Sequence, residues 1–127
     1  MGLVAIIVVL ALLQYVALGL LVGRARGQFG VTAPATSGHE VFERYFRVHQ
    51  NTAEVLVAFL PAIWLFAIYV STTWAAALGV VYLVGRFVYL RSYVRDPSSR
   101  SLGFGLSVFP ILVMMIGTVV GAVLTLV

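Results

Sequence analysis

Polar side chains that bind charged groups recur at helical spacing in one short stretch of the chain. They are three, four and three residues apart: Arg44, Arg47, Asn51 and Glu54. At about 100° per residue, these positions lie on one face of a helix. Such a face offers guanidinium groups, which bind carboxylates with paired hydrogen bonds, together with an amide and a carboxylate that holds an ammonium group. This set suits a small zwitterion with more than one carboxylate.

A second polar stripe follows about 30 residues later, with spacings of four, three and four. Its members are Tyr82, Arg86, Tyr89 and Tyr93. We interpret Tyr82 as a residue of the aromatic belt at a membrane interface. Two tyrosines one turn apart and close to Arg86 are less ordinary, because their hydroxyls can hydrogen-bond to a thiol, a phosphate or a carboxylate.

The elements that must position these residues are membrane helices. Residues 1–23, 55–85 and 101–127 carry no charge, and about 20 apolar residues span a bilayer as a helix. The central stretch is too long for one crossing and has a polar break at residues 71–73. We therefore expect an all-α integral membrane protein with one domain, residues 1–127, and four helices at about residues 2–23, 42–70, 74–94 and 101–126. The Asp96-Pro97 step is expected to end the third helix.

The charges predict an orientation and a class of partner. All eight cations are Arg, and they lie in or beside segments 24–41 and 94–101, which share one side of a four-span protein. The positive-inside rule places that side in the cytosol. The net charge of +4 favours anionic headgroups or an anionic ligand over nucleic acid. We expect Arg91 and Arg95 to reach lipid headgroups.

Other classes of site find little support in the sequence. The chain has no Cys, so disulfides and Cys-ligated metals are excluded. Its two histidines, His39 and His49, are ten residues apart, and we predict no metal site. Gly19, Gly23, Gly117 and Gly121 form two small-x-x-x-small pairs that favour close helix packing.

Charged groups on a membrane helix are costly unless they are paired or wetted, so a functional role is the first hypothesis for the face around Arg47. The alternative is a structural network in which Arg47 pairs with Glu43 and Glu54. His49 points to the opposite side of the same helix. A hydrogen bond between helices explains this imidazole as well as a binding role does.

The stretch from Phe42 to Glu54 (FERYFRVHQNTAE) resembles the signature F-E-R-x-x-R-x-x-x-N-x-x-E of the MAPEG family, the membrane-associated proteins in eicosanoid and glutathione metabolism. The similarity continues through Trp64, Arg86, Tyr89 and Tyr93 to Arg100, and it extends back to Arg26. It covers residues from about 24 to 105.

This resemblance implies a homotrimer that binds glutathione between neighbouring subunits near the cytosolic membrane face. The positions that match glutathione contacts in the microsomal transferase and leukotriene-forming branch are Arg26, Arg47, Asn51, Glu54, Tyr89, Tyr93 and Arg100. His49 stands where that branch has a Gln from the adjacent subunit. By the same resemblance, Arg100 and Tyr93 are the catalytic candidates, with Arg100 stabilising the glutathione thiolate.

The expected activity is a glutathione transferase that conjugates the thiolate to a lipophilic electrophile from the bilayer, with reduction of lipid hydroperoxides as a further expectation. Glutathione is the co-substrate, and no metal is expected. Gly27 replaces a second Arg and Val55 replaces a Tyr of the leukotriene-forming branch, which makes that specialised epoxide reaction doubtful here. The alternatives are a non-catalytic lipid-binding scaffold and, less favoured, a small four-helix exporter.

Overall fold

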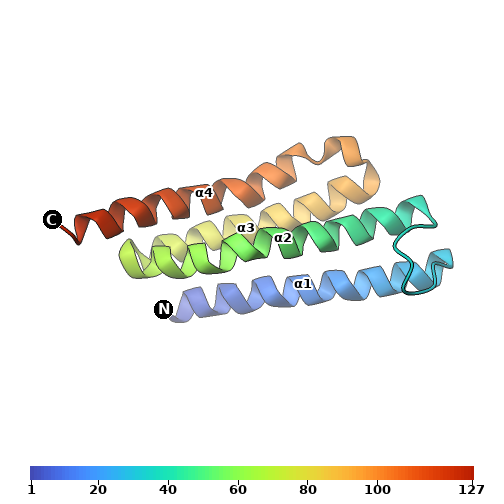
Figure 1. Cartoon of the computed structure of the whole chain (residues 1–127), viewed down its shortest axis with the longest axis horizontal. Coiled ribbons are helices and arrows are strands. Elements are labelled where there is room, and N and C mark those ends of the chain that lie inside the picture. Colours follow the sequence, from blue (N-terminus) through green and yellow to red (C-terminus); the bar gives the residue numbers. More distant parts are fainter.

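Four long α-helices make up the computed structural model, which describes residues 1–127. They are α1 (Gly2–Phe29), α2 (Glu40–Tyr69), α3 (Thr72–Arg95) and α4 (Ser101–Leu124), with a short 3-10 turn, η1 (Pro97–Ser99), before α4. The helices run side by side, with both chain termini at one end and the α1–α2 segment and η1 at the other (Figure 1). All four are long and apolar enough to cross a membrane. The expected all-α integral membrane fold is confirmed.

The ends of the helices follow from local chemistry. α1 continues through Arg24 and Arg26 to Phe29, beyond its expected end at about residue 23, because a helix C-terminus accommodates cations. It ends at Gly30, whose φ of 69° is left-handed and therefore favours glycine. α2 begins after His39, whose Nδ1 accepts a hydrogen bond from the Val41 amide at 3.1 Å.

α2 and α3 each pack against all three of the other helices. α2 supplies much of the core. Its buried side chains, among them Leu56, Phe59 and Ile63, form the largest apolar core with residues of α1, α3 and α4. Tyr82 of α3 belongs to this core. It is fully buried and stacks on Phe59 with the ring centroids 3.8 Å apart, so its interpretation as a belt residue is wrong.

α3 and α4 approach each other most closely at two glycines. A Cβ on Gly85 would lie 2.6 Å from the backbone of Leu106, and one on Gly103 would lie 2.4 Å from the amide nitrogen of Tyr89. Backbone atoms cannot move aside as a side chain can, so only glycine fits at either position.

The glycines that the sequence analysis singled out behave differently from one another. A Cβ on Gly19 would lie 3.2 Å from the His49 ring, one on Gly117 would lie 2.6 Å from the Phe66 ring and one on Gly121 would lie 2.6 Å from the Tyr69 carbonyl oxygen, whereas a Cβ on Gly23 would meet nothing within 4 Å. Three of the four therefore mark close packing inside the chain. The tightest approach to a backbone atom, at Gly103, lies outside both pairs.

Candidate functional site

The only buried charged side chain of the protein is that of Arg86, which is 1% exposed in the middle of the bundle. Its Nε donates to Ser107 Oγ of α4 at 2.8 Å, and one Nη donates to Asn51 Oδ1 of α2 at 2.8 Å and to Thr52 Oγ1 at 3.2 Å. We call these four residues the Arg86 cluster. It joins three helices around one guanidinium and fixes the orientation of the Asn51 amide.

The close contact of α3 with α4 makes this cluster geometrically feasible. Gly85 precedes Arg86 and lets the α4 backbone lie against α3 at Leu106 and Ser107. The Ser107 hydroxyl can then reach Arg86 Nε while it also donates to the Gly103 carbonyl at 2.7 Å. The remaining Nη of Arg86 is buried without a partner. Ser107 was not predicted, because a serine in an uncharged membrane span is indistinguishable by sequence from a packing residue.

Arg47 and Glu54 lie on the outer face of α2 and form an open pair. The Arg47 Nη1 and Glu54 Oε1 atoms are 3.7 Å apart, and their side chains are 49% and 55% exposed. Glu43 accepts a hydrogen bond from the Gly38 amide and makes no ion pair with Arg47. The structural network considered for this face is therefore reduced to one loose contact, and most of the hydrogen-bonding capacity of both groups is free.

Arg44 has a different role from Arg47, although the two are one turn apart. Its guanidinium donates to the carbonyl groups of Val94 and Arg95, at 3.0 and 3.3 Å, and pairs with Glu40. Val94 and Arg95 are the last residues of α3, so Arg44 caps the negative end of that helix. This contact between helices accounts for Arg44 without a ligand.

Tyr89, Tyr93 and Arg100 lie at the charged end of α3 and the start of α4. The Tyr89 and Tyr93 rings are 5.5 Å apart, and the Arg86 guanidinium lies over the Tyr89 ring at 4.4 Å. Tyr89 therefore lies against both Arg86 and Tyr93.

Arg100 is held at one edge and exposed at the other. One Nη donates to the Pro97 carbonyl of η1 at 2.9 Å, and the residue is otherwise open to solvent. The neighbouring Asp96 binds the Ser98 amide and hydroxyl at 3.1 and 2.8 Å. These hydrogen bonds from Ser98 lower the pKa of the Asp96 carboxyl, so this carboxylate stays ionised and shapes the turn that carries Arg100.

Arg26 and His49 lie elsewhere in the chain. Arg26 donates to the Ala35 carbonyl and stacks over the Phe42 ring at 4.8 Å. His49 stacks on Tyr15 of α1, with ring centroids 4.5 Å apart. Two residues along α2 place His49 about 160° around the helix from Arg47. One chain therefore does not bring Arg26 and His49 to the face that carries Arg47 and Glu54.

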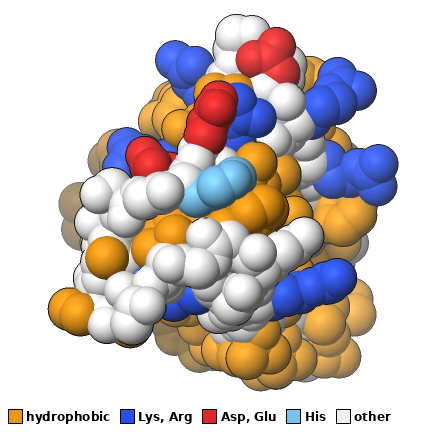
Figure 2. Space-filling view, turned by 90° about the vertical axis from the view of Figure 1, so that its right-hand side faces the viewer, with side chains coloured by type: hydrophobic (Ala, Val, Ile, Leu, Met, Phe, Trp, Pro, Cys, Tyr) orange, Lys and Arg blue, Asp and Glu red, His pale blue; other side chains and the backbone are white.

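Two grooves open near the charged end of the bundle. The smaller groove, of about 380 Å³, is lined by residues of α2 and α3. They include Arg47 and the acids Glu40 and Glu43 of α2, and Tyr93 of α3. The larger, of about 570 Å³, lies between α1, α2 and α3 and contains none of the predicted site residues. The end-on view shows Arg and acidic side chains gathered over an otherwise apolar molecule (Figure 2). The chain has no group of three or more metal-ligating side chains.

Four apolar helices with an Arg-rich polar end define a multi-pass integral membrane protein. Residues 4–120 match the model of the MAPEG family. An uncharacterized protein of Synechocystis sp. is 46% identical over 113 residues, which are 89% of this chain and 82% of the relative.

Two further relatives have names that state an activity, and they support the same family assignment. Microsomal glutathione S-transferase 2 of Homo sapiens is 37% identical over 105 residues, 83% of this chain and 71% of that protein. Leukotriene C4 synthase of Rattus norvegicus is 36% identical over 99 residues, 78% of this chain and 66% of that protein. The chain belongs to the MAPEG family, and the resemblance found in the sequence is confirmed.

Proposed function

We propose that this protein is a membrane-bound glutathione transferase that activates glutathione as a thiolate for conjugation to lipophilic electrophiles. The observation that carries the proposal is the open pair Arg47–Glu54 beside a fixed Asn51 amide. Glutathione has two carboxylates, one ammonium group and two peptide groups, so it matches a guanidinium, a carboxylate and an amide on one face. The relatives named for glutathione transfer support the same chemistry.

Arg47 and Glu54 bind the charged groups of glutathione in this proposal, and Asn51 binds its backbone. The Oδ1 atom of Asn51 already accepts from Arg86, so its NH₂ group is the free end that donates to the ligand. Tyr89 and Tyr93 contribute to the wall of the site, and the Tyr93 hydroxyl assists Arg100 at the sulfur.

Arg100 stabilises the thiolate. A free thiol has a pKa of about 8.5 and is mostly protonated at neutral pH, whereas the thiolate is the reactive species. The proton leaves to solvent, and the guanidinium balances the sulfur charge without taking part in covalent chemistry. The thiolate then forms a C–S bond to the electrophile, and the leaving group departs with the electron pair. With a lipid hydroperoxide, the thiolate attacks the terminal oxygen, the O–O bond breaks, and the alkoxide takes a proton from solvent and leaves as an alcohol. The glutathione sulfenic acid formed in this step condenses with a second glutathione to give the disulfide and water.

The site requires more than one copy of the chain, and we propose the homotrimer that the family resemblance implies. Arg26 and His49 lie on the α1 side of α2, away from Arg47 and Glu54. A neighbouring subunit that presents its α1 side to this face would complete the set of contacts. Crosslinking in native membranes tests the proposal, and a monomeric active protein would contradict it.

The charged end faces the cytosol in this proposal, as the concentration of Arg at that end favours. Accessibility of a Cys introduced at Thr36, in the α1–α2 segment, tests it. Labelling from the cytosolic side by a membrane-impermeant maleimide supports the orientation, and labelling from the opposite side alone contradicts it.

The decisive experiment for the chemistry is an ultraviolet difference titration with glutathione at neutral pH. The wild-type protein is expected to give a saturable thiolate absorbance, and Arg100→Ala is expected to lose it while glutathione binding by calorimetry weakens less. Arg24→Gln is a matched control, because this exposed Arg at the same end makes none of the proposed contacts. Binding without thiolate in the wild type would favour the non-catalytic scaffold.

A further inference from the structure

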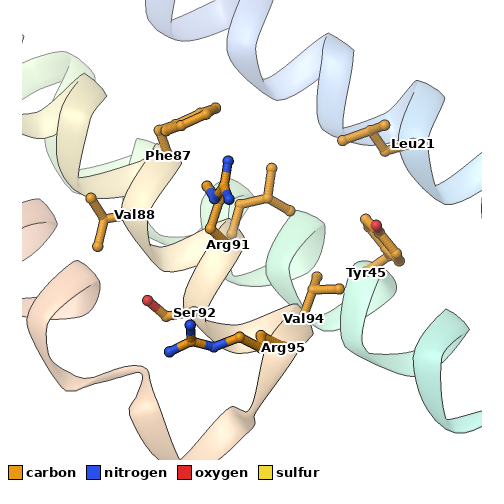
Figure 3. A pocket seen from close by; sticks show the side chains of 9 residues that line it. Leu21, Tyr45, Phe87, Val88, Arg91, Ser92, Val94 and Arg95 are labelled. Carbon is orange, nitrogen blue, oxygen red and sulfur yellow. The ribbon is translucent and has the colours of Figure 1, made fainter.

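The larger of the two grooves has a cationic rim and an apolar wall. It holds about 570 Å³ between α1, α2 and α3, and its lining includes Leu21, Phe87, Val88 and Tyr45 as well as Arg91 and Arg95. Arg91 rises from α3 beside Phe87, toward α1, while Leu21 and Tyr45 line the opposite wall (Figure 3). The proposed glutathione site uses none of these residues.

The two guanidinium groups of this groove have no acidic partner. The ion pairs of the chain are Arg44–Glu40 and Arg47–Glu54, and no carboxylate lines the groove. Arg91 and Arg95 are four residues apart on one helix, where like charges destabilise the helix. An anion between them removes this repulsion. The smaller groove differs, because Glu40 and Glu43 line it together with Arg44 and Arg47, so its acidic and basic side chains are equal in number.

The depth of the groove matches the boundary of the bilayer. Trp74 lies in the first turn of α3, and Tyr93 lies near its other end. Tyr93 is nineteen positions after Trp74, a helix rise of about 28 Å, close to the roughly 30 Å of a hydrocarbon core. Arg91 and Arg95 therefore flank the level of the headgroups. Phe87, one turn deeper, is 57% exposed and faces the region of the acyl chains.

We infer that this groove is a specific site for one anionic phospholipid. The headgroup phosphate lies between Arg91 and Arg95, the Tyr45 hydroxyl donates to it, and one acyl chain runs along Leu21, Val88 and Phe87. Two cations without a carboxylate select a net negative lipid over a zwitterionic one, whose choline group would find no anionic partner here. The apolar wall selects a lipid over free phosphate. This site is independent of the proposed glutathione chemistry.

Native mass spectrometry of the full-length protein in mild detergent tests the site. Dioleoylphosphatidylglycerol is titrated against dioleoylphosphatidylcholine, with inorganic phosphate and oleate as separate arms. The wild type is expected to retain one phosphatidylglycerol per chain in preference to phosphatidylcholine. Arg91→Gln and Arg95→Gln are each expected to weaken its binding by roughly fivefold, and the double variant by roughly twentyfold.

Arg24→Gln is the matched control for general surface charge, since it removes an exposed Arg at the same end of the protein but outside the groove. It is expected to bind phosphatidylglycerol as the wild type does. Val88→Trp fills the apolar wall, keeps both cations and is expected to reduce lipid retention. Thermal unfolding of each variant in the absence of added lipid separates lost binding from lost folding.

Several outcomes would overturn the inference. Equal retention of the two phospholipids, or equal weakening by Arg24→Gln and by Arg91→Gln, would show that the lipid binds nonspecifically and not at this groove. Competition by inorganic phosphate at the same concentration as the lipid would show an anion site without a lipid. Tighter binding of oleate than of phosphatidylglycerol would assign the groove to a fatty acid.

Discussion

The Arg86 cluster and the open pair Arg47–Glu54 both include residues of α2, but the arginine is buried in the cluster and exposed in the pair. Arg86 is almost fully buried and donates to Asn51, Thr52 and Ser107 of two neighbouring helices. Arg47 is half exposed and makes only loose contacts, at 3.7 Å to Glu54 and 3.5 Å to Gln50. Asn51 lies between Arg47 and Glu54 in sequence but belongs to the cluster.

The difference separates scaffold from binding surface. Three hydrogen bonds from one desolvated guanidinium link α2, α3 and α4 in the interior of the bundle, whereas an exposed ion pair contributes little to stability. The open pair is therefore free to exchange its contacts for those of a ligand. Asn51 connects the two regions, because its carbonyl oxygen is held inside while its amino group is left for the outer face.

Truncation of the cluster should have the largest effect. Arg86→Ala removes a buried side chain and leaves a cavity, and we expect it to lower the free energy of unfolding by about 3 kcal/mol. Arg86→Lys should not restore stability, because one ammonium group cannot reach both Ser107 and Asn51. Unfolding in mixed detergent measures the change. Wild-type stability in Arg86→Ala would remove the distinction between the two regions.

Loss of one acceptor should have the next largest effect. Ser107→Ala leaves the charged Nε of Arg86 without a partner, and we expect the free energy of unfolding to fall by about 2 kcal/mol. Thr118→Ala is a matched control, since Thr118 also donates to a carbonyl of α4 and meets no charged group. Similar losses in both variants would mean that the bond between α3 and α4 is of no special importance.

Substitutions in the open pair should weaken glutathione binding and leave the stability of the fold unchanged. We expect Arg47→Ala and Glu54→Ala each to weaken glutathione binding by roughly tenfold, the value of one charged hydrogen bond. The melting temperature should stay near that of the wild type, because the pair is exposed and 3.7 Å apart. Calorimetry and thermal unfolding on the same samples check both halves. A large fall in melting temperature would show that the pair stabilises the fold and would contradict its assignment to the binding surface.

Gly27→Arg should have the smallest effect. A Cβ at this position would meet nothing within 4 Å, and arginine favours the helix over glycine by up to about 1 kcal/mol. We expect a slightly more stable protein whose conjugation of epoxides rises while conjugation of an aryl halide is unchanged. Parallel rise of both activities would show that the added charge acts on glutathione and not on the epoxide.

Much of the architecture could be predicted from the sequence because its signals are local. Uncharged stretches set the number of spans, the Asp96-Pro97 step ended α3, and helical periodicity placed Arg47 and Glu54 on one face. The family could be identified from the spacing of polar residues within FERYFRVHQNTAE. The assignment of individual residues to the glutathione site remains a prediction.

The contacts between helices could not be predicted from the same signals. Arg44 shares the periodicity of Arg47, yet it caps α3, which depends on how α2 and α3 are packed. Tyr82 has the composition of a belt residue, yet it stacks on Phe59 in the core. Ser107 became relevant only because Gly85 and Gly103 let α4 approach Arg86. Each of these outcomes depends on residues that are distant in sequence.

Arg86 also has a consequence for biogenesis. A translocon-inserted helix pays about 2.5–3.5 kcal/mol for an arginine near its centre, and α3 is the least apolar of the four spans. The hydrogen-bond partners of Arg86 are Asn51 and Thr52 on the preceding helix and Ser107 on the following one. α3 should therefore enter the bilayer efficiently only together with its neighbours, which makes the order of helix synthesis part of how the polar interior is assembled.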